Sequence, residues 1–468
     1  MFFDQAAGFI KSYIEDLDKA IVTYMPGNGL SFTQKTWLAF CITSVLITNS
    51  VCWARFERAG LGKYSLSALS WIFRNSKIPW DSLLTMSTII ILRKYGIKYG
   101  SLGIDDTEKK RSKSTVRISK VHKIKDKGSG GYIMGQTIVF LVLITPKITI
   151  PVGFAFYTPD PALKAWNKQD EKLRKEGVPK SRRPPKPPKN EKYPKIPEIA
   201  LQLLVHFKEN HPDIKIRCIF ADALYGTQVF LDSASELFRG IQVISQIRSN
   251  QNISFRGKNM KVEEYFSKYP GTKQTIKIRG GKEVVVFTGS ARLHVCSHGK
   301  KRFVIALKYE GEDKYRYIVA SDLSWRSSDI LEAYTLRWLV EVFFEDWKQN
   351  EGWGRMTKQT GEDGSDRSLI LSLLTDHCLF FHPDQLACIE NNLPACTVGS
   401  LVEKIKVECL LVFIGNIISD ENPVKKLNQL SKAIKDNVII LKPSSKHMAN
   451  KNLGRLESTP SLKYKKAA

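Results

Sequence analysis

Residues 334–348 read Tyr334-Thr-Leu-Arg337-Trp-Leu-Val-Glu341-Val-Phe-Phe-Glu-Asp-Trp-Lys348. On a single helix, the four numbered side chains would share an arc of about 60°, and the mainly aromatic and aliphatic remainder would bury the other faces in a core. A carboxylate beside a phenol and two cations suits the binding of a metal next to a phosphate. An ordinary core helix with an Arg/Glu pair four residues apart explains the stretch equally well.

Composition places the chain among globular proteins that bind a polyanion. It has 468 residues, of which 43% are hydrophobic, so two or three domains with real cores are expected and overall disorder is excluded. Lys plus Arg outnumber Asp plus Glu by 72 to 46, which gives a formal net charge of +26. This excess predicts a nucleic-acid partner ahead of a membrane surface.

The apolar runs in the sequence predict core elements. Residues 37–53, 132–145 and 409–418 are apolar, but each run is too short for a bilayer or is broken by polar residues. We therefore expect no membrane-spanning segment. The eight cysteines have irregular spacing and no secretory signal precedes them, which favours reduced thiols in a cytoplasmic protein. A DNA partner would place that protein at the bacterial nucleoid.

Residues 1–96 are predicted to form a helical N-terminal domain. Its last part contains two short helical patterns around a tight turn near Pro79, with basic residues near their ends. This arrangement could be a helix-turn-helix that reads DNA. A plain helical bundle that packs on the next domain is at least as good an interpretation.

In the next region, 97–249, strand and helix patterns alternate, and acidic residues lie at the ends of two predicted strands. A short apolar approach from Tyr99 ends in Asp105-Asp106-Thr107, and a later strand pattern ends at Phe220, just before Asp222 and a predicted helix. In a strand-to-helix crossover, ligands bind at this end of the strand. Asp222 therefore lies at the end of a predicted strand, as Asp105 and Asp106 do.

Two excursions interrupt this core. Residues 159–197 are rich in Pro, Lys and Arg, and predict an extended, mobile loop that either contacts a DNA backbone or is simply solvated. Residues 250–325 show five or six short alternating patterns separated by Gly turns, which predict an antiparallel β insertion. A helical part of the core is expected over 326–420 and a basic tail over 421–468.

The spacing Tyr334, Arg337, Glu341, Lys348 resembles the Tyr-x2-Arg-x3-Glu-x6-Lys signature of the DDE transposases of bacterial insertion sequences, in the insertion sequence four group. Asp105-Asp106-Thr107 stands where that family carries its first acid, and Ala221-Asp222-Ala-Leu-Tyr-Gly226 stands where it carries the second. The β insertion also lies between the second and third acids, as in those enzymes. The resemblance spans about residues 99–380 and leaves out the N-terminal helices and the tail.

The resemblance implies an α/β fold with a ribonuclease-H-like catalytic core, interrupted by the β insertion and preceded by the helical domain. It implies that Asp105, Asp222 and Glu341 are catalytic and bind two Mg²⁺ (or Mn²⁺) ions. Carboxylate oxygens suit such hard cations, which can assist phosphodiester cleavage. Arg337, Lys348 and Tyr334 would contact the transposon end.

The expected activity is metal-dependent cleavage and strand transfer at inverted-repeat ends of double-stranded DNA, by a homodimer in the synaptic complex. A ribonuclease-H-like nuclease or resolvase would share the acids without needing Tyr334 and Lys348 in register. A domesticated DNA-binding protein without catalysis is a third hypothesis, and retention of every acid argues against it.

The first acid is a choice between neighbours. Strand alternation sends Asp105 and Asp106 to opposite faces of a sheet, so one of them is expected to bind metal, and Asp105 is preferred over Asp106. On the helix, Glu345 could still approach the site, whereas Asp346 should point away from it.

Overall fold

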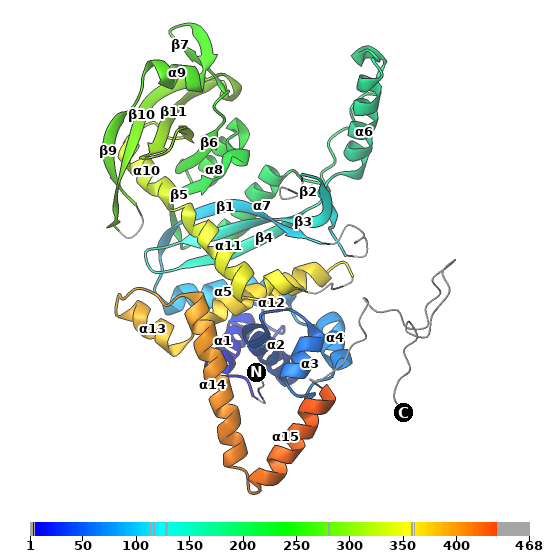
Figure 1. Cartoon of the computed structure of the whole chain (residues 1–468). Coiled ribbons are helices and arrows are strands. Elements are labelled where there is room, and N and C mark those ends of the chain that lie inside the picture. Colours follow the sequence, from blue (N-terminus) through cyan, green and yellow to red (C-terminus); the bar gives the residue numbers. More distant parts are fainter. Residues whose placement is uncertain are drawn as a thin grey trace, which may run out of the picture.

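The computed structural model describes residues 3, 5–111, 115, 118–126, 130–278, 281–356, 359 and 361–437. Within them, a twelve-stranded mixed sheet is flanked by helices, so the chain has a mixed α/β fold (Figure 1). Parts of the basic segment after the acid doublet, and the tail from residue 438 onward, lie outside these residues.

The first 96 residues are helical, as predicted. The helices are α1 (Gly8–Tyr24), α2 (Phe32–Thr48), α3 (Trp53–Ala59), α4 (Leu66–Asn75) and α5 (Trp80–Lys94). Ten of the fifteen residues of α5 are buried, and it packs against α1, β4 and α12. A recognition helix must expose one face to the major groove, so the arrangement favours the packing bundle over a helix-turn-helix.

Among the described residues, no single helix is both long enough and apolar enough to cross a bilayer. Helices α2 and α3 together have the length and apolar character of a span, but they form a pair bent by 90°.

Five strands form the part of the sheet that carries the acids. They are β1 (Tyr99–Lys110), β3 (Tyr132–Ile144), β4 (Thr149–Tyr157), β5 (Lys215–Ala221) and β6 (Gln242–Ile247), and the short β2 (His122–Lys125) extends the pairing of β3. Their spatial order is β4-β3-β1-β5-β6. β3 runs antiparallel to both β4 and β1, whereas β5 runs parallel to β1 and β6 runs parallel to β5. β1 therefore lies at the centre of this unit.

Helices cover both faces of these strands. On one face, α7 (Ile196–Asn210) contacts β3 and β4, and α8 (Gln228–Leu237) contacts α7 and β6. On the other face, the aromatic side chains of α11 (Trp338–Asn350) surround Phe140 of β3, with Phe343, Phe344 and Trp347 at ring-centroid distances of 5.1 to 5.7 Å. α11 is thus fixed against the strands by aromatic packing.

Residues 250–325 form an antiparallel unit, as predicted, with β7 (Asn252–Phe255), β8 (Lys258–Lys261), β9 (Thr272–Lys277), β10 (Glu283–Val295), β11 (Lys300–Tyr309) and β12 (Arg316–Ala320). A short helix, α9 (Val262–Lys268), was not expected. β12 pairs antiparallel with β6, so the insertion continues the sheet of the core (Figure 1).

The prediction of an extended loop over 159–197 was wrong for its first half. Residues Pro161–Lys175 form α6, a helix without buried residues that projects from the body of the molecule (Figure 1). The Asp160 side chain accepts from the backbone N–H of Ala162 and Leu163, Pro161 occupies the first turn, and basic residues lie at the C-terminal end. These local signals make a helix without any core contact.

The prediction of one continuous helix over 334–348 was also wrong. α10 (Ser327–Thr335) ends before Leu336, and α11 begins at Trp338. At the junction the backbone N–H groups of Leu336 and Arg337 bond to carbonyls three residues earlier, so the chain tightens into a 3₁₀-type turn. The four signature side chains therefore come from two helices and the turn between them.

The C-terminal helices pack against the N-terminal helices. They are α12 (Gly364–Leu379), α13 (Pro383–Glu390), α14 (Val398–Ile418) and α15 (Pro423–Asn437). α12 and α14 match the predicted packing helices. α15 lies inside the region predicted to be a tail, and it forms a V-shaped hairpin with α14 (Figure 1).

Candidate active site

The strand register brings the first two acids together. In the parallel pair β1–β5, Ile104 lies opposite Ala221, so Asp105 and Asp222 follow side by side where the two strands lead away from the core. The Asp222 charge is close enough to contribute to the raised pKa of Asp105. The two residues are 117 positions apart in the chain, and the sheet alone accounts for their proximity.

α11 approaches β1 closely at the same place. A Cβ on Gly103 would lie 2.5 Å from Cγ2 of Val340, so only glycine allows this contact. Gly103 and Asp105 are two residues apart on β1 and share a face, so Asp105 points toward α11 and Asp106 points away. Glu341 lies in the first turn of α11, on the same side of the sheet as Asp105.

Arg337 joins the strand acid to the helix acid. Its Nη1 lies 3.3 Å from Oδ2 of Asp105, and its Nη2 lies 2.5 Å from Oε1 of Glu341. The guanidinium is 18% exposed, so these ion pairs are only partly screened by water. Asp105 and Glu341 thus share one cation from the protein itself, and the Asp222 charge also acts on it.

The electrostatics at Asp105 favour a further cation. Burial raises the pKa of Asp105 to about 7, and the charges of Asp222 and Asp106 add to the rise. The N–H of Asp106 and the Arg337 guanidinium act in the opposite direction but do not offset it. A divalent ion between these carboxylates would relieve their repulsion.

Tyr225 is a buried hydroxyl that sequence reasoning missed. It follows Asp222 in a short 3₁₀ turn (η2, Ala223–Tyr225), its side chain is fully buried, and among the described residues its hydroxyl has no hydrogen-bond partner. Burial raises its pKa, and the charges of Asp106, Asp105 and Asp222 raise it further. An orphaned hydroxyl beside three carboxylates fits a site that holds a hydrated ion.

The donor set suits magnesium better than zinc, because it consists of carboxylate and hydroxyl oxygens. Among the residues that the structure describes, however, no three acids, histidines or cysteines lie close enough together to hold an ion in this conformation. The Arg337 guanidinium occupies the space between Asp105 and Glu341. Ion binding would therefore require Arg337 to turn away from one of them.

Tyr334 and Lys348, the other two signature residues, are less exposed than side chains that contact DNA directly would be. The Tyr334 hydroxyl accepts from Nε2 of Gln246 on β6 at 2.5 Å, and Tyr334 is only 7% exposed. Lys348 is half-buried with its Nζ 5.2 Å from the Phe344 ring centroid. Burial lowers the pKa of Lys348, although the charges of Asp105 and Glu108 counteract this.

A second cationic residue, also missed from the sequence, lies beside Lys348. Nζ of Lys109 on β1 donates to the carbonyl oxygens of Trp353 and Gly354, at 2.5 and 2.9 Å. Burial lowers the pKa of Lys109 to about 8, and the nearby charges of Arg111 and Lys348 add to this. Its position on the face of Asp105 follows from the alternation along β1.

A groove of about 730 Å³ opens next to the acids. It is lined by Tyr334, Arg337 and Glu341 and by residues of the β insertion that include Lys282, Glu312 and Arg316. The insertion thus lines the same groove as Glu341, where its Arg316 is paired with Glu312 and its Lys282 adds a positive charge.

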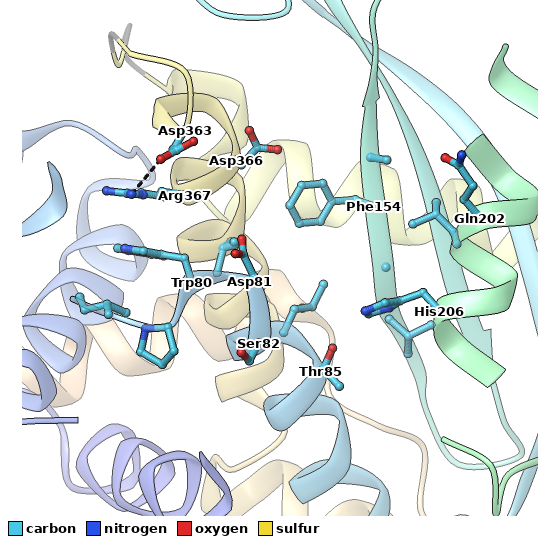
Figure 2. Close-up of a pocket in the computed structure, with 18 of the residues that line it drawn as sticks. Trp80, Asp81, Ser82, Thr85, Phe154, Gln202, His206, Asp363, Asp366 and Arg367 are labelled. Atoms are coloured by element: carbon cyan, nitrogen blue, oxygen red, sulfur yellow. Dashed lines mark hydrogen bonds and ion pairs between the residues drawn. The ribbon is translucent and has the colours of Figure 1, made fainter. Parts of the chain in front are cut away.

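Another cavity, of about 890 Å³, lies between α5, β4, α7 and the start of α12 (Figure 2). Two ion pairs line it: Asp363 binds Arg367 at 2.9 Å, and Asp366 binds Lys120 at 2.5 Å. None of the predicted site residues lines it.

Comparison with known proteins adds little. No protein-family model matches the chain, and no curated protein matches it. Among solved structures, the NurA nuclease from Sulfolobus solfataricus is similar over 51% of this chain and 72% of that chain, with 8% sequence identity and a TM-score of 0.26. A similarity at this level carries no argument about fold or function.

Proposed function

We propose that this protein is a DDE-type DNA transposase that cuts at the inverted-repeat ends of an insertion sequence and joins the freed 3′-hydroxyls to target DNA. The observation that carries the proposal is the meeting of Asp105, Asp222 and Glu341. They lie far apart in the sequence, yet the strand register brings Asp222 beside Asp105, and Arg337 pairs with both Asp105 and Glu341.

The strand arrangement supports the same proposal. The strand order is β4-β3-β1-β5-β6. The strands β4, β3 and β1 alternate in direction, and β5 and β6 run parallel to β1. This is the arrangement expected of a ribonuclease-H-like core. The first acid then lies on the central strand and the second on its parallel neighbour, as the resemblance to the transposases implies.

In this proposal the three acids hold divalent metal ions, which supply activation of the attacking water or 3′-hydroxyl and stabilisation of the leaving oxygen. Arg337 has a second role besides pairing with carboxylates. When it turns away from Asp105, its planar guanidinium can bind a DNA phosphate in two places. Lys348 and Lys109 add positive charge on the same side.

The test uses full-length protein, Mg²⁺ and duplexes that carry the DNA flanking the coding region on both sides. We expect nicks at the ends of paired inverted repeats and, with target DNA present, joined products. Nicks without end specificity would contradict the transposase proposal and favour a ribonuclease-H-like nuclease or resolvase. DNA binding without any cleavage in Mg²⁺ or Mn²⁺ would favour a non-catalytic DNA-binding protein.

A further inference from the structure

The segment that follows Asp222 joins the second acid to α8, and it packs tightly on β6. It consists of the 3₁₀ turn η2 and the residues after it, beginning with Gly226. A Cβ on Gly226 would lie 2.0 Å from the backbone oxygen of Gln246, so only glycine allows this approach. At the start of the segment, Oγ of Ser245 donates to the backbone oxygen of Asp222 at 2.8 Å. The backbone that carries Asp222 therefore contacts β6 at both ends of the turn.

A further contact to this segment comes from the β insertion. His298 ends a 3₁₀ turn (η4, Cys296–His298) just before β11, and it is only 5% exposed. Its Nε2 lies 3.2 Å from the carbonyl oxygen of Gly226. The insertion therefore reaches the segment after Asp222 through a side chain, in addition to the backbone pairing of β12 with β6.

Arg302 fixes which nitrogen of His298 carries the proton. Nε of Arg302 lies 3.2 Å from Nδ1 of His298, and a guanidinium can only donate. Nδ1 is therefore the acceptor, so the proton is on Nε2, which donates to the Gly226 carbonyl. Burial lowers the pKa of His298, and the Arg302 charge lowers it further, which favours this neutral ring.

Arg302 is in turn fixed by an acid on α8. The arginine is 2% exposed, and its Nη2 lies 2.6 Å from Oδ1 of Asp232. The other oxygen of Asp232 lies 2.8 Å from Nζ of Lys300 and 3.0 Å from Nε2 of Gln228. A buried guanidinium is costly without its carboxylate, so this pair holds Arg302 in one position. His298 is thus oriented by α8, and it binds the segment that leads into α8.

The groove beside Glu341 is lined by other residues, so His298 acts on the site only through the backbone. We propose that His298 is a positioning residue for the second acid. By holding the Gly226 carbonyl it fixes the backbone that carries Asp222, and the β insertion thereby sets the geometry of the carboxylates. The inference rests on the proposed function, which makes Asp222 a metal ligand. Residues that orient a metal ligand without touching the ion change metal affinity by about 10- to 100-fold.

Two substitutions in the full-length protein separate the two hydrogen bonds of the His298 ring. His298→Asn keeps an acceptor near the position of Nδ1, so the buried Arg302 retains a partner, but its amide is too short to reach Gly226. His298→Gln is longer by one methylene, and its amide can accept from Arg302 and donate to Gly226. The asparagine variant should therefore lose the positioning contact, and the glutamine variant should restore it.

His377→Asn is the matched control. His377 is also buried, and its two ring nitrogens contact the Ser87 hydroxyl at 2.7 Å and the backbone oxygen of Pro151 at 2.8 Å. These contacts join α12 to α5 and β4, away from the three acids. Substituting asparagine here removes a comparable buried contact to a backbone oxygen without touching the segment after Asp222.

Metal binding is measured without DNA by titrating Mn²⁺ and recording the electron paramagnetic resonance of the free ion. His298→Asn is expected to weaken Mn²⁺ binding at least about tenfold, and to raise by a similar factor the Mg²⁺ concentration that gives half-maximal end cleavage. His298→Gln and His377→Asn should remain within about threefold of the natural protein in both measurements.

Unchanged Mn²⁺ affinity in His298→Asn would overturn the proposal. An equal loss in His298→Gln or His377→Asn would also overturn it, because a general loosening of the core would then explain the effect. The titration separates this inference from the proposed function. If the natural protein binds Mn²⁺ but does not cut at the repeat ends, the transposase proposal fails, and the His298 variants still decide the role of His298. Unchanged Mn²⁺ affinity in Asp222→Asn would overturn both.

Discussion

Two groups of carboxylates lie near the two ends of α11, and they differ in how their charge is balanced. At the start of the helix, Asp105 and Glu341 share the Arg337 guanidinium and Asp222 lies beside them. At the end, Glu351 is completely buried and its carboxyl lies against that of Asp376. Among the described residues, no Lys, Arg or His forms an ion pair with either member of this second pair.

Burial favours the protonated form of the second pair, so no cation is needed to balance it. Burial raises the pKa of Glu351, and the neighbouring Asp376 charge and hydrogen bond raise it further. Burial likewise raises the pKa of Asp376 to about 7. Two carboxyl groups that share a proton are stable in a closed core, whereas acids beside a groove and an arginine can exchange that arginine for a metal ion. The comparison separates a structural acid pair from a candidate catalytic group.

The largest effect is expected from the first group. Glu341→Gln and Asp222→Asn should each lower end cleavage on the order of 1,000-fold, because each removes a proposed metal ligand, and should leave DNA binding within a few-fold. Gel-based cleavage and binding assays on the same DNA measure both quantities. Glu351→Gln is the matched control and should retain cleavage. If Glu351→Gln lost as much end cleavage as the other two variants, the proposed difference between the two carboxylate groups would be wrong.

Arg337→Ala should have the next largest effect, and it should depend on metal. Removing the cation leaves the Asp105 and Glu341 charges unbalanced, so the free energy of unfolding in the absence of Mg²⁺ should fall by about 1–2 kcal/mol. Denaturant unfolding with and without Mg²⁺ should show that the ion restores part of the loss. Arg367→Ala, which breaks the Asp363 pair on α12, should lose stability equally in both conditions.

Glu351→Gln should raise stability at high pH. The folded-state pKa values of Glu351 and Asp376 lie above their unfolded values, so the contribution of this pair to stability should be complete below about pH 4 and be lost as the pH rises through about 7. The Gln amide can donate to Asp376 at any pH, so the variant should be about 1–2 kcal/mol more stable than the natural protein at pH 8. Exposed Glu345→Gln is the control. A destabilised variant across pH 5 to 8 would contradict the shared proton.

The smallest effect is expected at Asp346, which lies on α11 between the two groups. It is half-buried, and burial together with the Glu345 charge raises its pKa. Asp346→Asn should change cleavage less than about twofold and stability by less than about 0.5 kcal/mol. A large loss of cleavage would mean that the candidate site extends farther along α11 than the contacts of Arg337 indicate.

Much of the fold followed from local patterns, and the errors have physical causes. The apolar residues before Asp105 and before Asp222 predicted β1 and β5, because a short apolar run that ends in an acid is a local sequence pattern. The break before Arg337 has no Gly or Pro to mark it. α6 was missed because the prolines after residue 178 outweighed the capping signal at Asp160.

The candidate site was predictable only in part. The spacing of the acids in the sequence indicated which residues to compare, but their meeting depends on the β1–β5 register and on the contact of Val340 with Gly103. Tyr225 and Lys109 gain their positions from tertiary contacts that no local pattern encodes. Tyr225 lies within the quoted run after Asp222, which was the one available signal for it.

The central claim is that Asp105, Asp222 and Glu341 hold divalent metal together. The most direct measurement replaces Mg²⁺ with Fe²⁺ and uses ascorbate and peroxide to generate hydroxyl radicals that cut the backbone next to the bound ion. The account predicts cuts close to residues 105, 222 and 341, competed by Mg²⁺ and lost in Asp222→Asn. Cuts confined to the neighbourhood of residues 351 and 376, or no localised cuts, would contradict it.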